Sequence, residues 1–313
     1  MSIESRIIGE FGGEHDGPLL ICLASVHGNE QAGVKAVDLV MKMLEVEPIT
    51  NPDFRFRGKM IGLIGNRTAF SLGRRYVDVD LNRQWTRDNI KRILEGKEDS
   101  DDWPVEWMEM KKILDLIRKL IAENQPKKVY LVDLHTTSAA GGIFSICTDD
   151  DESIALGQSF YAPVIKGFLK GIKGTFMHYF NSQNLGLPTT MITFESGQHK
   201  EPLSVNRAIA AVINVLRHIS CIRPEDVENQ HIKLLKDYSE GLPSLAELRI
   251  HHPIRPGDGF QMLPGFKNFD PVSAGQKLAE DHLGPIMSPM NGLILMPLYQ
   301  KQGADGFFII EPV

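Results

Sequence analysis

The sequence contains only three cysteines among its 313 residues, Cys22, Cys147 and Cys221. They are far apart and odd in number, and no Cys-x-x-Cys pair occurs, which argues against a disulfide framework and against a thiolate zinc site. The first 17 residues hold no apolar stretch of the kind found in signal peptides. These absences favour a reducing compartment, and we expect the protein to be cytoplasmic.

Long hydrophobic runs and long basic runs are also missing. No apolar run approaches the roughly 18 residues that a membrane-spanning helix needs. The formal net charge is -6 and Lys and Arg nowhere form a long run, which argues against binding to nucleic acid or to an anionic membrane surface. The expected partner is therefore a small molecule. The sequence is also compatible with a homo-oligomer.

The residues that are present indicate a globular α/β protein. Hydrophobic residues make up 42% and charged residues 24% of the chain, as in soluble globular proteins. Apolar runs typical of buried strands alternate with amphipathic segments typical of helices, which predicts an α/β fold with a mostly parallel central sheet. The expected strands are 18–26, 59–64, 129–134, 142–147 and 189–194, and the expected helices are 30–44, 107–121, 153–169 and 202–219.

The pattern changes after residue 222, where short runs are separated by turn sequences such as RPGDG and SPMNG. A chain of 313 residues is also too long for one ordinary core. We therefore predict a catalytic domain over 1–222 and a small β-rich domain over 223–313. The charged segment 86–104 shows little periodicity and is interpreted as a surface insertion.

Chemically active side chains follow several of the predicted strands. His27 and Glu30 follow the first strand, His135 follows the third, and Glu195 follows the last. Because parallel strands end at a common edge of the sheet, where ligands bind, these residues are expected to converge. Two histidines and a glutamate with one open position form a known catalytic zinc set.

Each of these residues also has a plainer explanation. His27-x-x-Glu30 alone is more often a histidine at a helix start followed by a glutamate that the helix dipole favours. Gly28 would allow a tight bend between the two ligands. His135 and Glu195 stand at the ends of other predicted strands of the same sheet. Their positions favour a metal site over a histidine and a glutamate that merely begin a helix.

Further polar residues suggest supporting roles. Asp133 lies two residues before His135 and shares its face of the strand, so it suits a contact behind a zinc histidine, with His27 as the expected partner, or a buried backbone cap. Glu195 is a candidate general base or the cap of the turn at Gly197. Several arginines lie between residues 55 and 83, and spacing alone does not separate catalytic from surface roles among them.

Four motifs taken together resemble the succinylglutamate desuccinylase/aspartoacylase family, a branch of the zinc carboxypeptidase-like fold. They are HGNE at 27–30, RYVDVDLNR at 75–83, VDLHTTS at 132–138 and FESGQ at 194–198, with looser similarity at 266–271 and 298–303. The resemblance implies a three-layer α/β/α domain with a mixed, mostly parallel sheet. It also implies a zinc-dependent deacylase that acts on N-acyl amino acids or related small amides.

The resemblance assigns roles residue by residue. His27, Glu30 and His135 would bind one Zn²⁺, and Glu195 would be the general base. Arg75 would polarise the scissile carbonyl. The substrate-binding residues would be Asn82 and Arg83, which would hold a carboxylate, together with Tyr299.

One departure from the family pattern concerns the substrate. Family members that act on acidic substrates carry an arginine upstream of the base, whereas no Lys or Arg occurs here from Gly174 to His199. N-acetylaspartate and succinylglutamate are therefore not the expected substrates. A metallocarboxypeptidase acting on short peptides and a non-catalytic zinc-binding protein remain alternatives.

Overall fold

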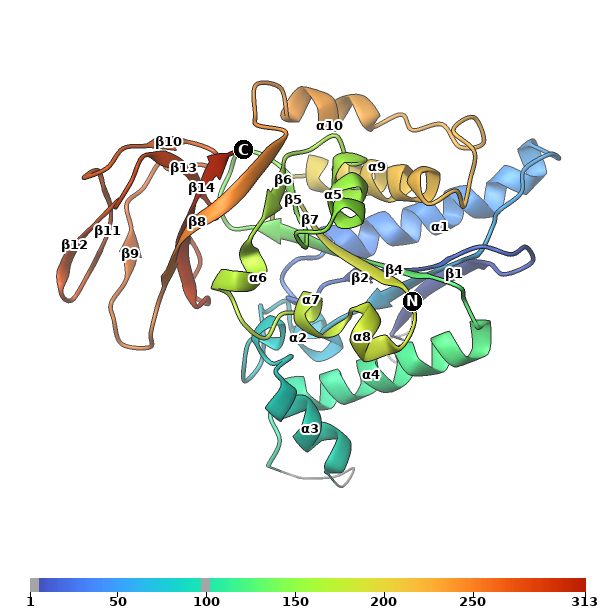
Figure 1. Cartoon of the computed structure of the whole chain (residues 1–313), viewed down its shortest axis with the longest axis horizontal. Coiled ribbons are helices and arrows are strands. Elements are labelled where there is room, and N and C mark those ends of the chain that lie inside the picture. The colour runs from blue at the N-terminus through green and yellow to red at the C-terminus, as the bar shows by residue number, and fades with distance from the viewer. Residues whose placement is uncertain (1–5, 97–101) are drawn as a thin grey trace.

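The centre of the molecule is a large mixed β-sheet, seen nearly edge-on in Figure 1. The computed structural model describes residues 6–96 and 102–313. Strands β3, β2, β4 and β7 run parallel, while β1 is antiparallel to β3 and β5 is antiparallel to β7. In spatial order the strands are β1 (Ile7–Gly12), β3 (Lys59–Ile64), β2 (Leu19–Ala24), β4 (Val129–Thr137), β7 (Thr189–Gln198), β5 (Phe144–Ile146), β6 (Val164–Lys166), β8 (Leu245–Pro253), β14 (Asp305–Pro312), β13 (Gly292–Leu295) and β10 (Pro271–Val272).

Helices cover both faces of this sheet. Leu20 of β2 packs into one core with helices α1 and α9, whereas the next residue, Ile21, packs into a second core with α4. Successive side chains of a strand point to opposite faces, so a strand buried on both sides is apolar throughout. The α/β/α layering and the mostly parallel sheet are as predicted.

The helices differ widely in length. None in the described ranges is long and apolar enough to span a membrane. They are α1 (Ala32–Thr50), α2 (Arg67–Leu72), α3 (Arg87–Glu95), α4 (Val105–Asn124), α5 (Asp151–Gln158), α6 (Phe168–Gly171), α7 (Phe176–Tyr179), α8 (Ser182–Leu185), α9 (Leu203–His218), α10 (Ile232–Tyr238) and the 3₁₀ turn η1 (Leu81–Arg83).

One local prediction was wrong. The helix expected over 153–169 ends at Gln158, and β6 and α6 follow it. Tyr161 adopts a left-handed conformation and Pro163 lacks a backbone N–H, so a helix cannot continue there. The segment 86–104 contains helix α3, which Thr86 caps by accepting from the Asn89 N–H; residues 97–101 lie outside the described ranges.

The C-terminal region is rich in strands, as expected. Strand β8 pairs in parallel with β6, so the large sheet continues from the first region into the last. A second sheet consists of β12 (Gly284–Met287), β11 (Lys277–Asp281) and β9 (Gln261–Met262). The predicted boundary between residues 222 and 223 falls in the connection from α9 to α10 and stays a prediction.

Candidate active site

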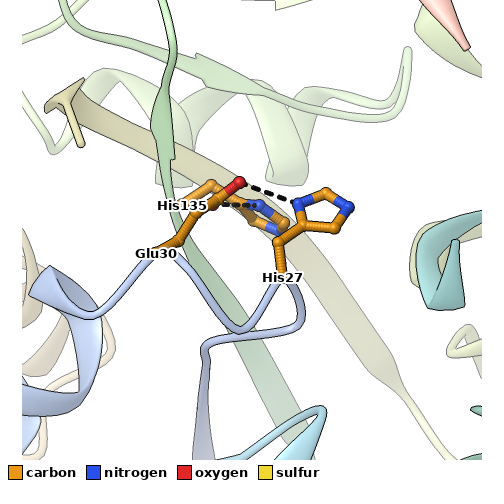
Figure 2. Close-up of side chains that lie close together, drawn as sticks. All are labelled: His27, Glu30 and His135. Atoms are coloured by element: carbon orange, nitrogen blue, oxygen red, sulfur yellow. Dashed lines mark hydrogen bonds and ion pairs between the residues drawn. The ribbon is translucent and has the colours of Figure 1, made fainter. Parts of the chain in front are cut away.

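The predicted metal ligands lie together at the carboxyl ends of the parallel strands. His27 follows β2, Glu30 stands two residues before the start of α1, and His135 belongs to β4. Figure 2 shows the carboxylate of Glu30 between the two imidazoles. Glu30 Oε1 is 2.8 Å from His27 Nδ1, and Glu30 Oε2 is 2.9 Å from His135 Nδ1.

These three side chains form a donor set that fits a divalent metal. One ligand atom from each lies within 4.8 Å of the others, and all three side chains are buried. Two imidazole nitrogens and one carboxylate are typical ligands of catalytic Zn²⁺. The three residues therefore have the chemistry and the proximity that a zinc ion requires.

Each histidine also contacts a second carboxylate through its other ring nitrogen. His27 Nε2 lies 3.1 Å from Asp80 Oδ1, and His135 Nε2 lies 2.8 Å from Asp133 Oδ2. This corrects the expected pairing, because Asp133 contacts His135, its neighbour two residues along the same strand face, and not His27. The His27–Asp80 contact is a hydrogen bond, which fixes the orientation and tautomer of that ring, whereas His135 Nε2 and the Asp133 oxygens form no hydrogen bond among the described residues.

The charges of the site are strongly coupled. Burial alone would raise the pKa of Glu30, but His27 and His135 hold it well below the usual range. Burial alone would lower the pKa of His135, but Asp133 and Glu30 raise it well above the usual value. The ligand cluster thus holds a buried carboxylate that stays ionised and an imidazole that lies in a negative field from two carboxylates.

Backbone packing explains the glycine between the first two ligands. A Cβ atom on Gly28 would lie 2.1 Å from the Ala69 carbonyl carbon. The expected tight bend is also present, because Gly28 and Asn29 form a turn that the Glu30 N–H closes on the His27 carbonyl at 3.0 Å. The glycine is therefore required both by this turn and by the close approach to α2.

Glu195 lines the same cavity as the metal-binding cluster. It lies in β7 directly opposite His135 in the β4–β7 ladder. Burial, together with the nearby Glu30 and Asp133, raises its pKa to about 8. Its Oε2 atom has no hydrogen-bond partner among the described residues. A buried carboxyl that titrates near neutral pH is suited to proton transfer.

Arg75 also lines this cavity and is held by a neighbouring carboxylate. Its guanidinium donates to Asp80 Oδ2 at 3.0 Å and lies 3.6 Å from Glu30. Burial alone would lower the pKa of Arg75, but these two carboxylates raise it. Asp80 therefore contacts both Arg75 and His27, two of the predicted site residues.

The loop that carries Arg75 and Asp80 is shaped by Glu106, which the sequence did not single out. This buried carboxylate of α4 accepts the backbone N–H groups of Val77, Asp78 and Val79 at 2.7 to 3.1 Å. It also accepts from the Asn66 side chain at 3.0 Å. Three successive N–H groups around one anion fix the course of a loop, as in anion-binding nests.

Asn82 and Arg83 line the cavity as well. Asn82 Oδ1 accepts the Phe176 N–H at 3.0 Å, which leaves its amide nitrogen as the donor. Arg83 forms an ion pair with Asp305 of β14. Asp305 Oδ1 lies in addition 2.7 Å from His251 Nε2. The residues after 222 therefore contribute directly to this end of the cavity.

Tyr299 does not line the cavity, although the neighbouring Leu298 and Gln300 do. Its hydroxyl donates to the Leu263 carbonyl at 2.8 Å and accepts the Phe266 N–H at 3.0 Å. The expectation that Tyr299 binds the substrate is thus not supported by this arrangement. Tyr299 instead links its own loop to the loop that contains Leu263 and Phe266.

Gln300 connects the C-terminal loop to the ligand turn. Its Oε1 accepts from Asn29 Nδ2 at 3.2 Å and lies 3.3 Å from His199 Nε2. His199 Nδ1 in turn lies 2.7 Å from Thr136 Oγ1, next to His135. Asp305 was missed in the sequence because it stands in no recognisable motif. Gln300 lies in the loosely similar segment at 298–303 and Asp80 inside the motif at 75–83, so both were available there.

Comparison with known proteins agrees with this geometry. Residues 16–219 match the model of the succinylglutamate desuccinylase/aspartoacylase catalytic domain. The chain belongs to this family. A relative from Nostoc sp., named a probable aspartoacylase, is 30% identical over 130 residues, which are 41% of this chain and 38% of that protein. The chain thus matches well under half the length of this curated relative.

Solved structures share the fold over nearly the whole chain. The succinylglutamate desuccinylase from Chromobacterium violaceum superposes with a TM-score of 0.63 at 19% identity, covering 97% of this chain and 88% of that one. A succinylglutamate desuccinylase/aspartoacylase from Rhodobacter sphaeroides gives a TM-score of 0.64 at 18% identity, covering 96% and 86%. At such identities the likeness establishes the fold, including the C-terminal region, and not the substrate.

Proposed function

We propose that this protein is a zinc-dependent deacylase that hydrolyses the amide bond of N-acyl amino acids or similar small amides bearing a carboxylate. The observation that carries the proposal is the meeting of His27, Glu30 and His135 at one point, with Glu195 opposite His135 in the same cavity. Membership of the succinylglutamate desuccinylase/aspartoacylase family supports the same reaction class.

His27, Glu30 and His135 would hold the zinc ion. When bound, zinc supplies Lewis acidity and lowers the pKa of a coordinated water to about 7. Asp80 would keep the His27 imidazole oriented from behind through its hydrogen bond, which tunes the strength of that ligand, and Asp133 would place a negative charge beside His135.

Glu195 accepts a proton from the attacking water and delivers it to the leaving nitrogen. Burial of Glu195 and the lack of a hydrogen-bond partner on Oε2 among the described residues favour its protonated form, which is the form that delivers the proton. Arg75, held by Asp80, offsets negative charge that develops on the carbonyl oxygen. The proton removed from water thus returns with the amine product, and the acyl group leaves as a carboxylic acid.

Asn82 and Arg83 would bind the carboxylate of the substrate. Because Asn82 Oδ1 accepts the Phe176 N–H, the amide is oriented and its NH₂ group is placed as the donor to a ligand. The guanidinium of Arg83 supplies positive charge beside it, and Asp305 fixes its position. An amide donor and a guanidinium side by side suit a planar carboxylate.

The proposal is tested with a hydrolysis screen on protein loaded with one equivalent of zinc. The panel contains N-acetyl and N-succinyl amino acids, dipeptides and simple amides without a carboxylate, and the released amine is quantified. We expect turnover of N-acyl amino acids, little turnover of dipeptides, and loss of activity on chelation with recovery on adding zinc back.

The two alternatives give different results in the same screen. A metallocarboxypeptidase would turn over the dipeptides and leave the N-acyl amino acids untouched. A non-catalytic zinc protein would bind one zinc and hydrolyse none of the panel. Either result would contradict the proposed deacylase.

A further inference from the structure

One wall of the cavity is apolar. We use the term apolar wall for six of its lining residues, Ile146, Phe168, Leu169, Ile172, Met177 and Phe308. They come from β5, α6, the segment after α6, α7 and β14. The rings of Phe168 and Phe308 lie 5.0 Å apart, and both belong to the core that also contains α4. The wall is thus anchored in the core of the protein.

The apolar wall borders the Asn82–Arg83 end of the cavity. Phe308 stacks on His251 at 4.9 Å, and His251 contacts Asp305, the partner of Arg83. Phe176, the residue before Met177, donates its backbone N–H to Asn82 Oδ1. A group packed on this wall therefore lies beside the proposed carboxylate-binding pair, on the amino acid side of the scissile amide.

Among the residues that the structure describes, the arginines that line the cavity are already paired. They are Arg75, which is bound to Asp80, and Arg83, which is bound to Asp305. The segment from Gly174 to His199, which forms part of the wall, contributes no Lys or Arg. A second carboxylate on the substrate would therefore lose its hydration without gaining a partner, and such a loss is costly.

We propose that the amino acid released by this enzyme carries a large apolar side chain, which packs on the apolar wall. The inference rests on the proposed deacylase function and names its substrate class. Burying such a side chain against Phe168, Met177 and Phe308 favours binding, whereas an acidic side chain at the same place is disfavoured. Discrimination of about tenfold or more is expected from one side chain in such a pocket.

The first test ranks substrates with the acetyl group kept constant. N-acetylmethionine and N-acetylglutamine have side chains of similar length and differ in polarity, while N-acetylaspartate and N-acetylglutamate add a charge. We expect kcat/KM for N-acetylmethionine, N-acetylleucine and N-acetylphenylalanine to exceed that for the glutamine and acidic compounds by at least tenfold. Equal or faster hydrolysis of the acidic compounds would overturn the proposal.

A second test locates the preference in the wall. Met177→Ala should lower kcat/KM for N-acetylphenylalanine severalfold and leave N-acetylalanine nearly unchanged. Leu169→Arg should shift the ratio toward N-acetylaspartate by about tenfold, because it adds a free cation at the wall. Leu39→Arg, on the exposed side of α1, is the control and should change neither ratio. Substrate ratios unaffected by both wall variants would overturn the assignment.

Binding separates this inference from the proposed reaction. The zinc-loaded Glu195→Gln protein is titrated calorimetrically with the same N-acetyl amino acids, so that no hydrolysis is needed. Tighter binding of the apolar compounds supports the inference even if the wild-type protein hydrolyses none of them, a result that would count against the deacylase alone. Tighter binding of the acidic compounds rejects the inference whatever the activity.

Discussion

Glu195 and Glu30 are both buried glutamates of one cavity, yet their surroundings give them opposite properties. Two histidines contact Glu30 and hold its pKa low, so it remains an anion. Glu195 Oε2 finds no partner within the described part of the chain, and burial raises its pKa to about 8. These different environments fit the proposed roles of Glu30 as a metal ligand and of Glu195 in proton transfer.

The first prediction concerns Glu195. Glu195→Gln keeps the size of the side chain and removes its ability to accept a proton, so we expect hydrolysis to fall by about 10²-fold or more. Zinc content, measured by atomic emission on purified protein, should remain near one equivalent, because Glu195 is not a proposed ligand. A variant that retains full activity would contradict the mechanism.

The second prediction concerns Glu106, which touches none of the proposed ligands. In the Glu106→Gln variant an NH₂ group replaces one carboxylate oxygen. This NH₂ group would face backbone N–H groups of the 77–79 loop, which would lose their acceptor. We expect the free energy of unfolding to fall by about 2–4 kcal/mol. We also expect a loss of activity, because the disturbed loop would shift Arg75 and Asp80. Urea unfolding and steady-state kinetics measure the two effects.

Glu123→Gln is the matched control for this prediction. Glu123 lies on the same helix, and more than half of its side chain is exposed. Its replacement should leave stability within about 0.5 kcal/mol of the wild type. If the two variants behaved alike, Glu106 would have no special part in shaping the loop.

At the level of secondary structure, the 3₁₀ turn η1 and strand β14 are tied together by one ion pair, Arg83 with Asp305. The two residues are 222 positions apart, and the pair joins the motif at 75–83 to the last strand of the chain. Burial alone would raise the pKa of Asp305, but Arg83 and His251 lower it to about 2. The ionised form of Asp305 is therefore favoured in the folded protein.

This pair has a consequence for acid stability. The folded-state pKa of about 2 lies below the value of about 3.9 expected in the unfolded chain. The stabilisation is thus fully present above about pH 4 and is lost as the pH falls toward 2, and it amounts to on the order of 2 kcal/mol. Urea unfolding at pH 6, 4 and 3 should show the gap between wild type and Asp305→Asn narrowing below pH 4. A gap that stays constant with pH would contradict this account.

The elements that the sequence predicted well are those with continuous apolar runs or strong helical periodicity. The runs at 59–64 and 189–194 mark the starts of β3 and β7, and the amphipathic pattern at 107–121 lies inside α4. Strand β6 was missed because it has only three residues, and its apolar residues were absorbed into a helical pattern. Helix α3 was missed because only two of its residues, Ile90 and Ile93, are buried hydrophobics, and the charged residues around them leave little apolar periodicity in the sequence.

For the molecule as a whole, the proposed zinc ligands are distant in sequence and adjacent only after folding. Glu30 and His135 are 105 residues apart and meet because β2 and β4 pair in parallel. Because the unfolded chain offers no such site, zinc should bind the folded state preferentially and stabilise it. Zinc at about 100 times its dissociation constant would contribute about 2.7 kcal/mol.

Thermal unfolding with and without zinc checks this coupling. The wild-type Tm should rise by several degrees on adding zinc and fall back on chelation. His135→Ala should lose most of the zinc-dependent shift, whatever its own Tm, whereas His218→Ala, an exposed histidine of α9, should keep it. A shift of equal size in both variants would place the zinc elsewhere.

The sequence alone determined the layered α/β architecture, the family and the cluster of His27, Glu30, His135 and Glu195. It did so because apolar periodicity is local and because each of these residues stands in a short motif at a strand end. The tertiary structure decided which groups share the site from outside those motifs. Contacts such as Glu106 with the 77–79 loop, Asp305 with Arg83, and Tyr299 with Leu263 join distant segments through side chains whose spacing carries no periodic signal. The apolar wall beside Arg83 exists for the same reason, since the fold brings together β5, the segment 168–177 and β14, which are far apart in the sequence.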